Sequence, residues 1–223
     1  MIAATGLRWV LTVLFAVPAL SALWRAATPG RADGGPGASG RVAHLLHAVM
    51  ALAMVAMVWP WGMDVPARPQ IILFTLAAGW YAGVALARPA PLSRARALSD
   101  ALPHTVMMGA MAWMAAAMVS SASMPGHGGS HDMADMPGMD MSAGSGTATM
   151  TLTGTGPRLA AGLLAGVLLV LALWWLARGF DAAQRAVATG PRHPSPPAGR
   201  DAFDLGCHGA MALGMAVTFV LLL

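Results

Sequence analysis

The sequence predicts an all-α, polytopic integral membrane protein with six transmembrane helices, N-out and C-out. Of its 223 residues 57% are hydrophobic and only 10% are charged, whereas a soluble globular domain carries about a quarter charged residues. Six apolar runs have roughly the 20 residues that a bilayer-spanning helix needs. The basic residues, all arginine, lie mainly between these runs, so we interpret them as topology signals and not as a nucleic-acid-binding surface.

The first apolar run covers residues 7–24, with Trp9 and Trp24 placed as interfacial anchors. A cleaved signal peptide is the competing interpretation, because Arg8 precedes the run and small residues follow it. We favour a retained helix, since its removal would reverse the orientation that the later arginines indicate.

Five further spans follow, and each is bounded by turn-forming or aromatic residues. The second ends at Trp59-Pro60-Trp61-Gly62 and the fifth ends at Trp174 and Trp175. The predicted spans are residues 42–58, 70–87, 100–119, 159–177 and 202–223. The chain thus divides into helices 1–4 (1–119), a loop (120–157) and helices 5–6 (158–223).

Arginines are distributed unevenly between the two sides of the predicted bundle. One side carries Arg25, Arg31, Arg41, Arg88, Arg94, Arg96, Arg178, Arg185, Arg192 and Arg200. The other side carries only Arg8, Arg68 and Arg158. By the positive-inside rule the first side is cytoplasmic, so both termini and the 120–157 loop are expected outside a multi-pass cytoplasmic membrane protein.

A His-x-x-Met-x-x-x-Met pattern occurs three times, once in each of the second, fourth and sixth spans. Residues at i, i+3 and i+7 of a helix share one face, so each copy forms a stripe. The three stripes are His47-Met50-Met54, His104-Met107-Met111 and His208-Met211-Met215. These spans run in the same direction, which predicts three helical hairpins in a pseudo-threefold arrangement with matching side chains at matching depths.

The stripes contain the ligands of a soft metal ion. Thioether sulfur suits Cu(I), and imidazole also binds copper. Two stacked layers of neutral methionines, with a histidine layer on their cytoplasmic side, avoid the high cost of protein charge inside a bilayer. The sequence therefore predicts a Cu(I) site between the three helices. His44 and Cys207 are further candidate ligands at its inner mouth, and Asp100 and Asp204 are candidate partners for the second ring nitrogens of two histidines.

The predicted loop carries a second set of soft-metal ligands on a Gly-rich backbone, and we expect it to be largely disordered without metal. Its candidate ligands are Met124, His127, His131, Met133, Met136, Met139 and Met141. Such a segment can collect copper, either free or from a periplasmic or other extracytoplasmic copper-binding protein.

A structural role remains open for both sets. Methionine commonly fills gaps between packed helices, and the loop methionines can be incidental to a low-complexity linker. Three copies in one register, each led by a histidine inside the membrane, favour function over packing.

Three resemblances accompany these motifs. The loop resembles the Met/His/Asp-rich segments of periplasmic copper-resistance proteins. The parallel Met-x-x-x-Met helices resemble the pore of the trimeric copper transporter family, although that family has three spans per subunit and an N-terminal Met-rich segment. Through His44-Leu-Leu-His47-Ala-Val-Met50, Pro103-His104-Thr-Val-Met107-Met108 and Cys207-His208-Gly-Ala-Met211, the whole chain resembles a bacterial six-span family described as a domain of unknown function (DUF5134).

Three functions are compatible with the sequence. Copper(I) transport or homeostasis is the leading hypothesis. A haem-binding electron-transfer protein is the second, because haem takes His or Met axial ligands. The third is a non-catalytic membrane scaffold, in which the stripes are packing seams. We predict no enzyme, because no Ser/His/Asp arrangement, carboxylate pair or phosphate-binding loop stands out.

Overall fold

Six long α-helices and one short 3-10 helix make up the fold, and the described residues contain no strand. The structure is a computed structural model that describes residues 5–28, 37–87, 91–122, 152, 154–188 and 197–223. The elements are α1 Thr5–Ala27, α2 Gly37–Val58, η1 Pro60–Asp64, α3 Ala67–Leu86, α4 Pro91–Ala122, α5 Thr155–Ala188 and α6 Pro197–Leu221. All six α-helices are long and apolar enough to cross a membrane, which confirms the predicted fold class.

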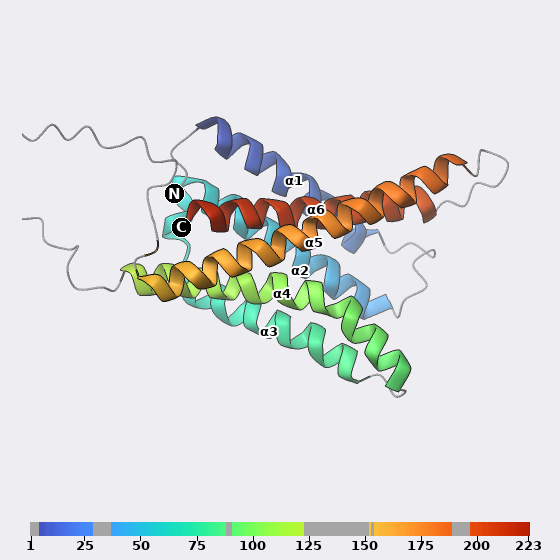
Figure 1. The fold of residues 1–223 in the computed structure, drawn as a ribbon, viewed down its shortest axis with the longest axis horizontal. Helices are drawn as coiled ribbons and strands as arrows, with labels where there is room; N and C mark the ends of the chain where they lie inside the picture. Colours follow the sequence, from blue (N-terminus) through green and yellow to red (C-terminus); the bar gives the residue numbers. More distant parts are fainter. Residues whose placement is uncertain (1–4, 29–36, 88–90, 123–151, 153, 189–196) are drawn as a thin grey trace, which may run out of the picture.

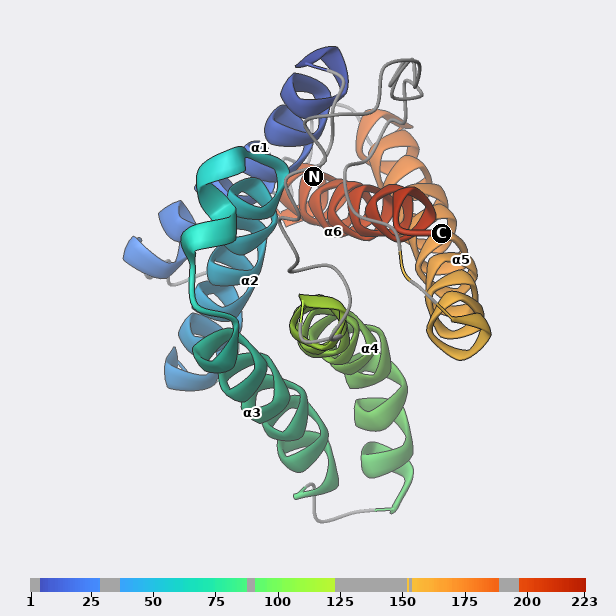
Figure 2. The same cartoon turned by 90° about the vertical axis from the view of Figure 1, so that its left-hand side faces the viewer.

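The helices pack as three consecutive hairpins, α1 with α2, α3 with α4, and α5 with α6. In Figure 1 the odd-numbered helices run in one direction and the even-numbered helices return in the other. The three stripe-bearing helices α2, α4 and α6 are therefore parallel. Figure 2 shows the hairpins grouped around a common centre, with α1, α3 and α5 towards the outside.

Two helices extend well beyond the spans that hydropathy predicts. The fourth begins at Pro91 and the fifth ends at Ala188, where the sequence predicts spans of 100–119 and 159–177. Hydropathy detects only the part of a helix that lies in hydrocarbon. Arginine is a good helix former, so residues such as Arg94 and Arg185 continue the helix outside that layer.

Burial separates the inner helices from the outer ones. Half of the apolar window of α4 and of α6 is buried and 33% of that of α2, but 28% or less of the corresponding windows of α1, α3 and α5. Large apolar side chains of the outer helices, such as Leu76 and Leu163, are more than 60% exposed. A surface of this kind is covered by lipid in a membrane protein.

A close contact between α1 and α6 joins the first hairpin to the third. A Cβ added at Gly214 would lie 2.5 Å from Phe15 Cζ, so only glycine lets the two helices approach this closely. Farther along the same contact, Arg25 and Asp204 form an ion pair of 2.7 Å.

The two ends of the bundle differ in charge, and we call one of them the basic end. Among the described residues, it carries Arg25, Arg41, Arg94, Arg96, Arg178 and Arg185. The opposite end carries Arg8, Arg68 and Arg158. The stripes run away from the basic end, so the histidines lie closer to it than the methionines do.

Candidate metal centre

The three stripe histidines meet at the centre of the bundle. His47 of α2, His104 of α4 and His208 of α6 have ring centroids 4.8 to 5.1 Å apart. One ring nitrogen of each lies within 4.8 Å of those of the other two. The sequence predicts this histidine layer, and the structure brings its three residues together as one group.

Backbone carbonyls fix which nitrogen carries the proton in two of these histidines. Nδ1 of His47 lies 2.8 Å from the Ala43 carbonyl oxygen, and Nδ1 of His208 lies 2.8 Å from that of Asp204. A carbonyl can only accept, so both Nδ1 atoms donate and both Nε2 atoms keep a lone pair that can accept a hydrogen bond or bind a metal ion. Metal-binding histidines typically use their second nitrogen in this way.

The spacing of the nitrogens fits a metal ion with a small adjustment. His47 Nε2 and His104 Nδ1 are 3.1 Å apart. Nitrogens at about 2.0–2.1 Å from a tetrahedral metal ion are roughly 3.3 Å from one another. An ion between these two atoms would replace the proton that they share, and His104 would then carry its own proton on Nε2. The third nitrogen lies within 4.8 Å of the other two, so it would have to approach them by up to about 1.5 Å.

Two aromatic residues from outer helices enclose the histidines. Tyr81 of α3 places its hydroxyl oxygen 3.0 Å from His47 Nδ1 and stacks on His104 with ring centroids 5.2 Å apart. Trp175 of α5 lies 5.6 Å from His104 and 5.4 Å from His208 by ring centroid. The sequence predicts Trp175 only as a residue that closes the fifth span; in the structure it is 4% exposed and α5 continues beyond it to Ala188.

The stripe methionines occupy the next two turns towards the opposite end. They are all 2% exposed or less and belong to one apolar cluster: Met50, Met54, Met107, Met111, Met211 and Met215. Along a helix, the first methionine lies about 4.5 Å and the second about 10.5 Å from its histidine. The structure therefore supports two thioether levels beyond the histidine layer.

An apolar layer, which we call the cap, covers the far side of the methionines. Eleven residues beyond the three histidines lie Val58, Ala115 and Phe219, each 2% exposed or less. Trp113 packs against Phe219 with ring centroids 5.7 Å apart. The cap separates the methionine levels from the opposite end of the bundle.

Other candidate ligands lie outside the histidine group. Cys207 is buried with its sulfur 3.5 Å from Ser21 Oγ, facing α1. His44 is half-buried one turn towards the basic end and, among the described residues, is not part of the metal-binding group.

The expected carboxylate partners differ from those in the structure. Asp204 holds His208 through its backbone carbonyl, while its carboxylate pairs with Arg25. No hydrogen bond joins Asp100 to His104 within the part of the chain that the structure describes. The backbone carbonyl of Asp204, and not its carboxylate, accepts from His208, because a carbonyl four residues earlier already lies beside the histidine ring on the same helix.

The predicted loop ligands lie outside the described residues. They are Met124, His127, His131, Met133, Met136, Met139 and Met141. Their role as a metal-collecting segment stays a prediction.

Comparison with known proteins gives a family and no activity. A family profile described as a domain of unknown function (DUF5134) matches residues 39–222. Uncharacterized proteins of Mycobacterium bovis and Mycobacterium tuberculosis are 43% identical over 77 residues, 34% of this chain. The match spans 35% of the length of each relative. No solved structure gives a significant match.

Proposed function

The chain belongs to the family described as a domain of unknown function (DUF5134), and we propose that it is a copper(I)-binding membrane protein of copper transport or homeostasis. The observation that carries this proposal is the group of three histidines on parallel helices, followed by buried thioethers on the same three stripes. Every donor in this arrangement is uncharged, as a site inside a bilayer requires.

The combination of ligands favours copper over other ions. Imidazole suits zinc, copper, iron and nickel, whereas thioethers select Cu(I). Copper is therefore the metal that both the histidine layer and the methionine levels accept. Hard cations such as Mg²⁺ and Ca²⁺ prefer several oxygen ligands, whereas the stripe side chains offer nitrogen and sulfur.

The same proposal includes an orientation. With the basic end in the cytoplasm, the Met/His-rich loop faces the extracytoplasmic side of the cytoplasmic membrane. It would collect copper there, from solution or from an extracytoplasmic copper-binding protein, and supply it to the stripes. In this role the protein binds and moves an ion and carries out no bond-breaking chemistry.

The geometry supports haem less well. The three imidazole rings contact one another at centroid distances near 5 Å. Tyr81 and Trp175 fill the space beside them, so no planar macrocycle fits between two of the histidines without moving whole helices.

Metal content of purified protein tests the proposal. The starting protein lacks residues 123–142, so that the loop cannot bind metal, and it is loaded with Cu(I) under reducing conditions. We expect about one ion per chain, lost when His47→Gln, His104→Gln and His208→Gln are combined. Met108→Leu is the control, because Met108 is as buried as the stripe methionines but does not lie on the stripe of α4.

Two results would contradict the proposal. One is the same copper content in the triple glutamine variant as in its parent. The other is no copper in the loop-deleted parent, provided that it elutes as a folded species and melts cooperatively. A haem absorption band in the purified protein would move the haem hypothesis ahead of copper.

A further inference from the structure

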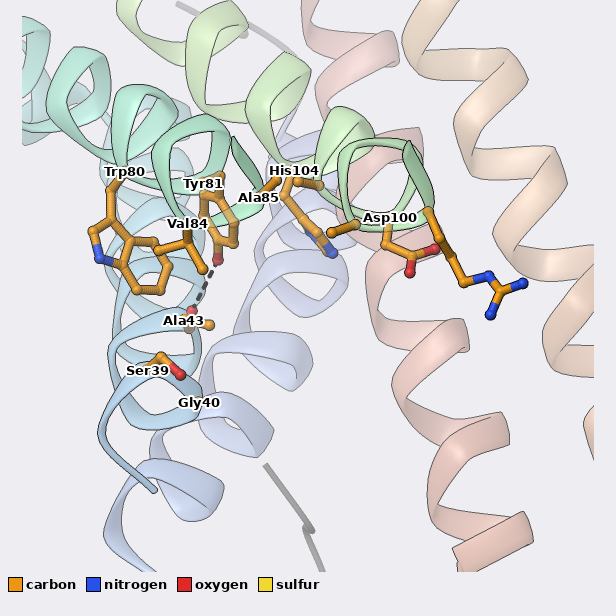
Figure 3. A pocket seen from close by; sticks show the side chains of 12 residues that line it. Ser39, Gly40, Ala43, Trp80, Tyr81, Val84, Ala85, Asp100 and His104 are labelled. Carbon is orange, nitrogen blue, oxygen red and sulfur yellow. Dashed lines mark hydrogen bonds between the residues drawn. The ribbon is translucent and has the colours of Figure 1, made fainter. Parts of the chain in front are cut away.

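A cavity of about 500 Å³ opens at the basic end, between α2, α3 and α4. Figure 3 shows its wall, with Ser39 and Ala43 from α2, Trp80 and Tyr81 from α3, and Asp100 and His104 from α4. The remaining walls include small side chains such as Ala85 and Ala97, which leave the space open.

This cavity reaches the histidine group directly. His104 and Tyr81 both line it, and both contact His47. Its lining is mainly apolar, with the polar side chains of Ser39, Arg96 and Asp100 among it. A space of this volume accommodates a small solute, which these polar groups can contact.

The other route out of the histidine group passes through tightly packed side chains, as far as the described residues extend. It leads past the methionine levels to the cap, where Val58, Ala115 and Phe219 are buried. Near it, the Leu152 N–H donates to the Leu222 carbonyl at 2.9 Å. Thus the histidines adjoin a cavity on one side and a core of buried apolar side chains on the other.

We propose that the ion bound by the histidine group is exchanged at the basic end through this cavity, passing Asp100 and His104, with a small water-soluble ligand as donor or acceptor. This inference rests on the proposed function and adds to it the side and the route of exchange. The volume is that of a small-molecule site, so a small complex of the ion fits, whereas a docked protein domain would have to remain outside.

Blocking the cavity with a covalent label tests the route. In a Cys207→Ser background, Ala97→Cys is labelled with a bulky, membrane-impermeant maleimide; Ala97 lines the cavity. Leu98→Cys is the matched control, since it neighbours Ala97 on α4 but is not part of the lining. The protein lacks residues 123–142, is loaded with Cu(I), and is then exposed to excess bathocuproine disulfonate.

We expect the label at residue 97 to slow copper extraction by about tenfold or more, as occlusion of an access path does, and the label at 98 to leave the rate unchanged. If Ala97→Cys folds poorly, Val84→Cys replaces it, because Val84 lies on the α3 wall of the same cavity. A label at residue 84 should slow extraction in the same way.

Equal extraction rates in labelled Ala97→Cys and labelled Leu98→Cys, with full initial copper loading in both, would overturn the route while leaving the metal site intact. Failure of the proposed function gives a different result. In that case the unlabelled parent holds no histidine-dependent copper, and no extraction is seen in any variant.

Discussion

The two halves of the central stripes, which lie on the same three helices, differ in how their donor atoms are held. At the basic end, His47 and His208 are tied by carbonyl hydrogen bonds, and Tyr81 and Trp175 enclose the rings. Towards the opposite end the methionines pack within one cluster of buried apolar side chains. The first half is oriented by specific polar contacts and the second by packing alone.

We infer from this difference that the histidine half and the methionine half have separate roles. Fixed imidazole nitrogens define a position for an ion, because their direction and tautomer are set before binding. Thioethers on three rotatable bonds adapt to an ion as it passes and discriminate by softness. We therefore expect the histidine half to determine where a metal rests and the methionine half to determine which metal is accepted.

Among the substitutions that test these separate roles, removing the thioethers nearest the histidines should change metal affinity most. Met50→Leu, Met107→Leu and Met211→Leu together keep the volume of the core. We expect Cu(I) affinity to fall by more than the roughly 100-fold typical of changes around a metal ligand, with Zn(II) affinity at the histidines unchanged. Competition titrations with both metals measure these affinities. Equal losses of Cu(I) and Zn(II) affinity would contradict separate roles for the two halves.

Two glycines of α6 differ in how closely other side chains approach them, and alanine substitutions should reveal it. Gly214→Ala pushes against Phe15 and should destabilise the protein by about 1–3 kcal/mol. Gly206→Ala is the control, because no atom lies within 4 Å of its added Cβ. Thermal unfolding in detergent compares them, and equal melting temperatures would show that the α1–α6 contact is not tight.

The hydroxyl of Tyr81 should matter only for the histidine half. Tyr81→Phe keeps the ring that stacks on His104 but removes the oxygen 3.0 Å from His47 Nδ1. Loss of such a partner of a metal ligand lowers metal affinity by about tenfold, and here the loss should be the same for Cu(I) and Zn(II). Trp80→Phe, which alters a neighbouring wall residue of the cavity, should leave both affinities unchanged.

The smallest effect is expected at Asp204. Asp204→Asn removes the charge that pairs with Arg25 but keeps the carbonyl that holds His208. Because the pair is partly exposed, the free energy of unfolding should fall by only about 0–1 kcal/mol, and copper affinity should not change. A clear drop in affinity would show instead that the carboxylate itself positions the histidine.

The sequence was sufficient to predict the six helices, the three hairpins and the meeting of His47, His104 and His208. Length and hydropathy determine the number of spans, and alternation of direction makes the even-numbered helices parallel. Since a histidine inside an apolar span rarely faces lipid, three of them at matching depth point to one centre.

The contacts of Tyr81 and Trp175 from the outer helices with the histidines were not predicted from the sequence. Tyr81 is the only tyrosine of the chain, and a hydroxyl in an apolar span needs a partner, so that signal was present but unused. Trp175 gave no such signal, because the rotation of α5 about its axis depends on its packing against α6. The cavity was likewise invisible, since it results from small residues on three helices that are distant in sequence.

The three hairpins are covalently linked, and this has an evolutionary consequence. In an assembly of identical subunits one mutation alters every layer three times, whereas here a mutation alters one third of a layer. Each stripe can therefore diverge in small steps, as Tyr81 beside His47 and the Asp204 carboxylate paired with Arg25 illustrate. Selection can then adjust one ligand of the site while the other two keep it working.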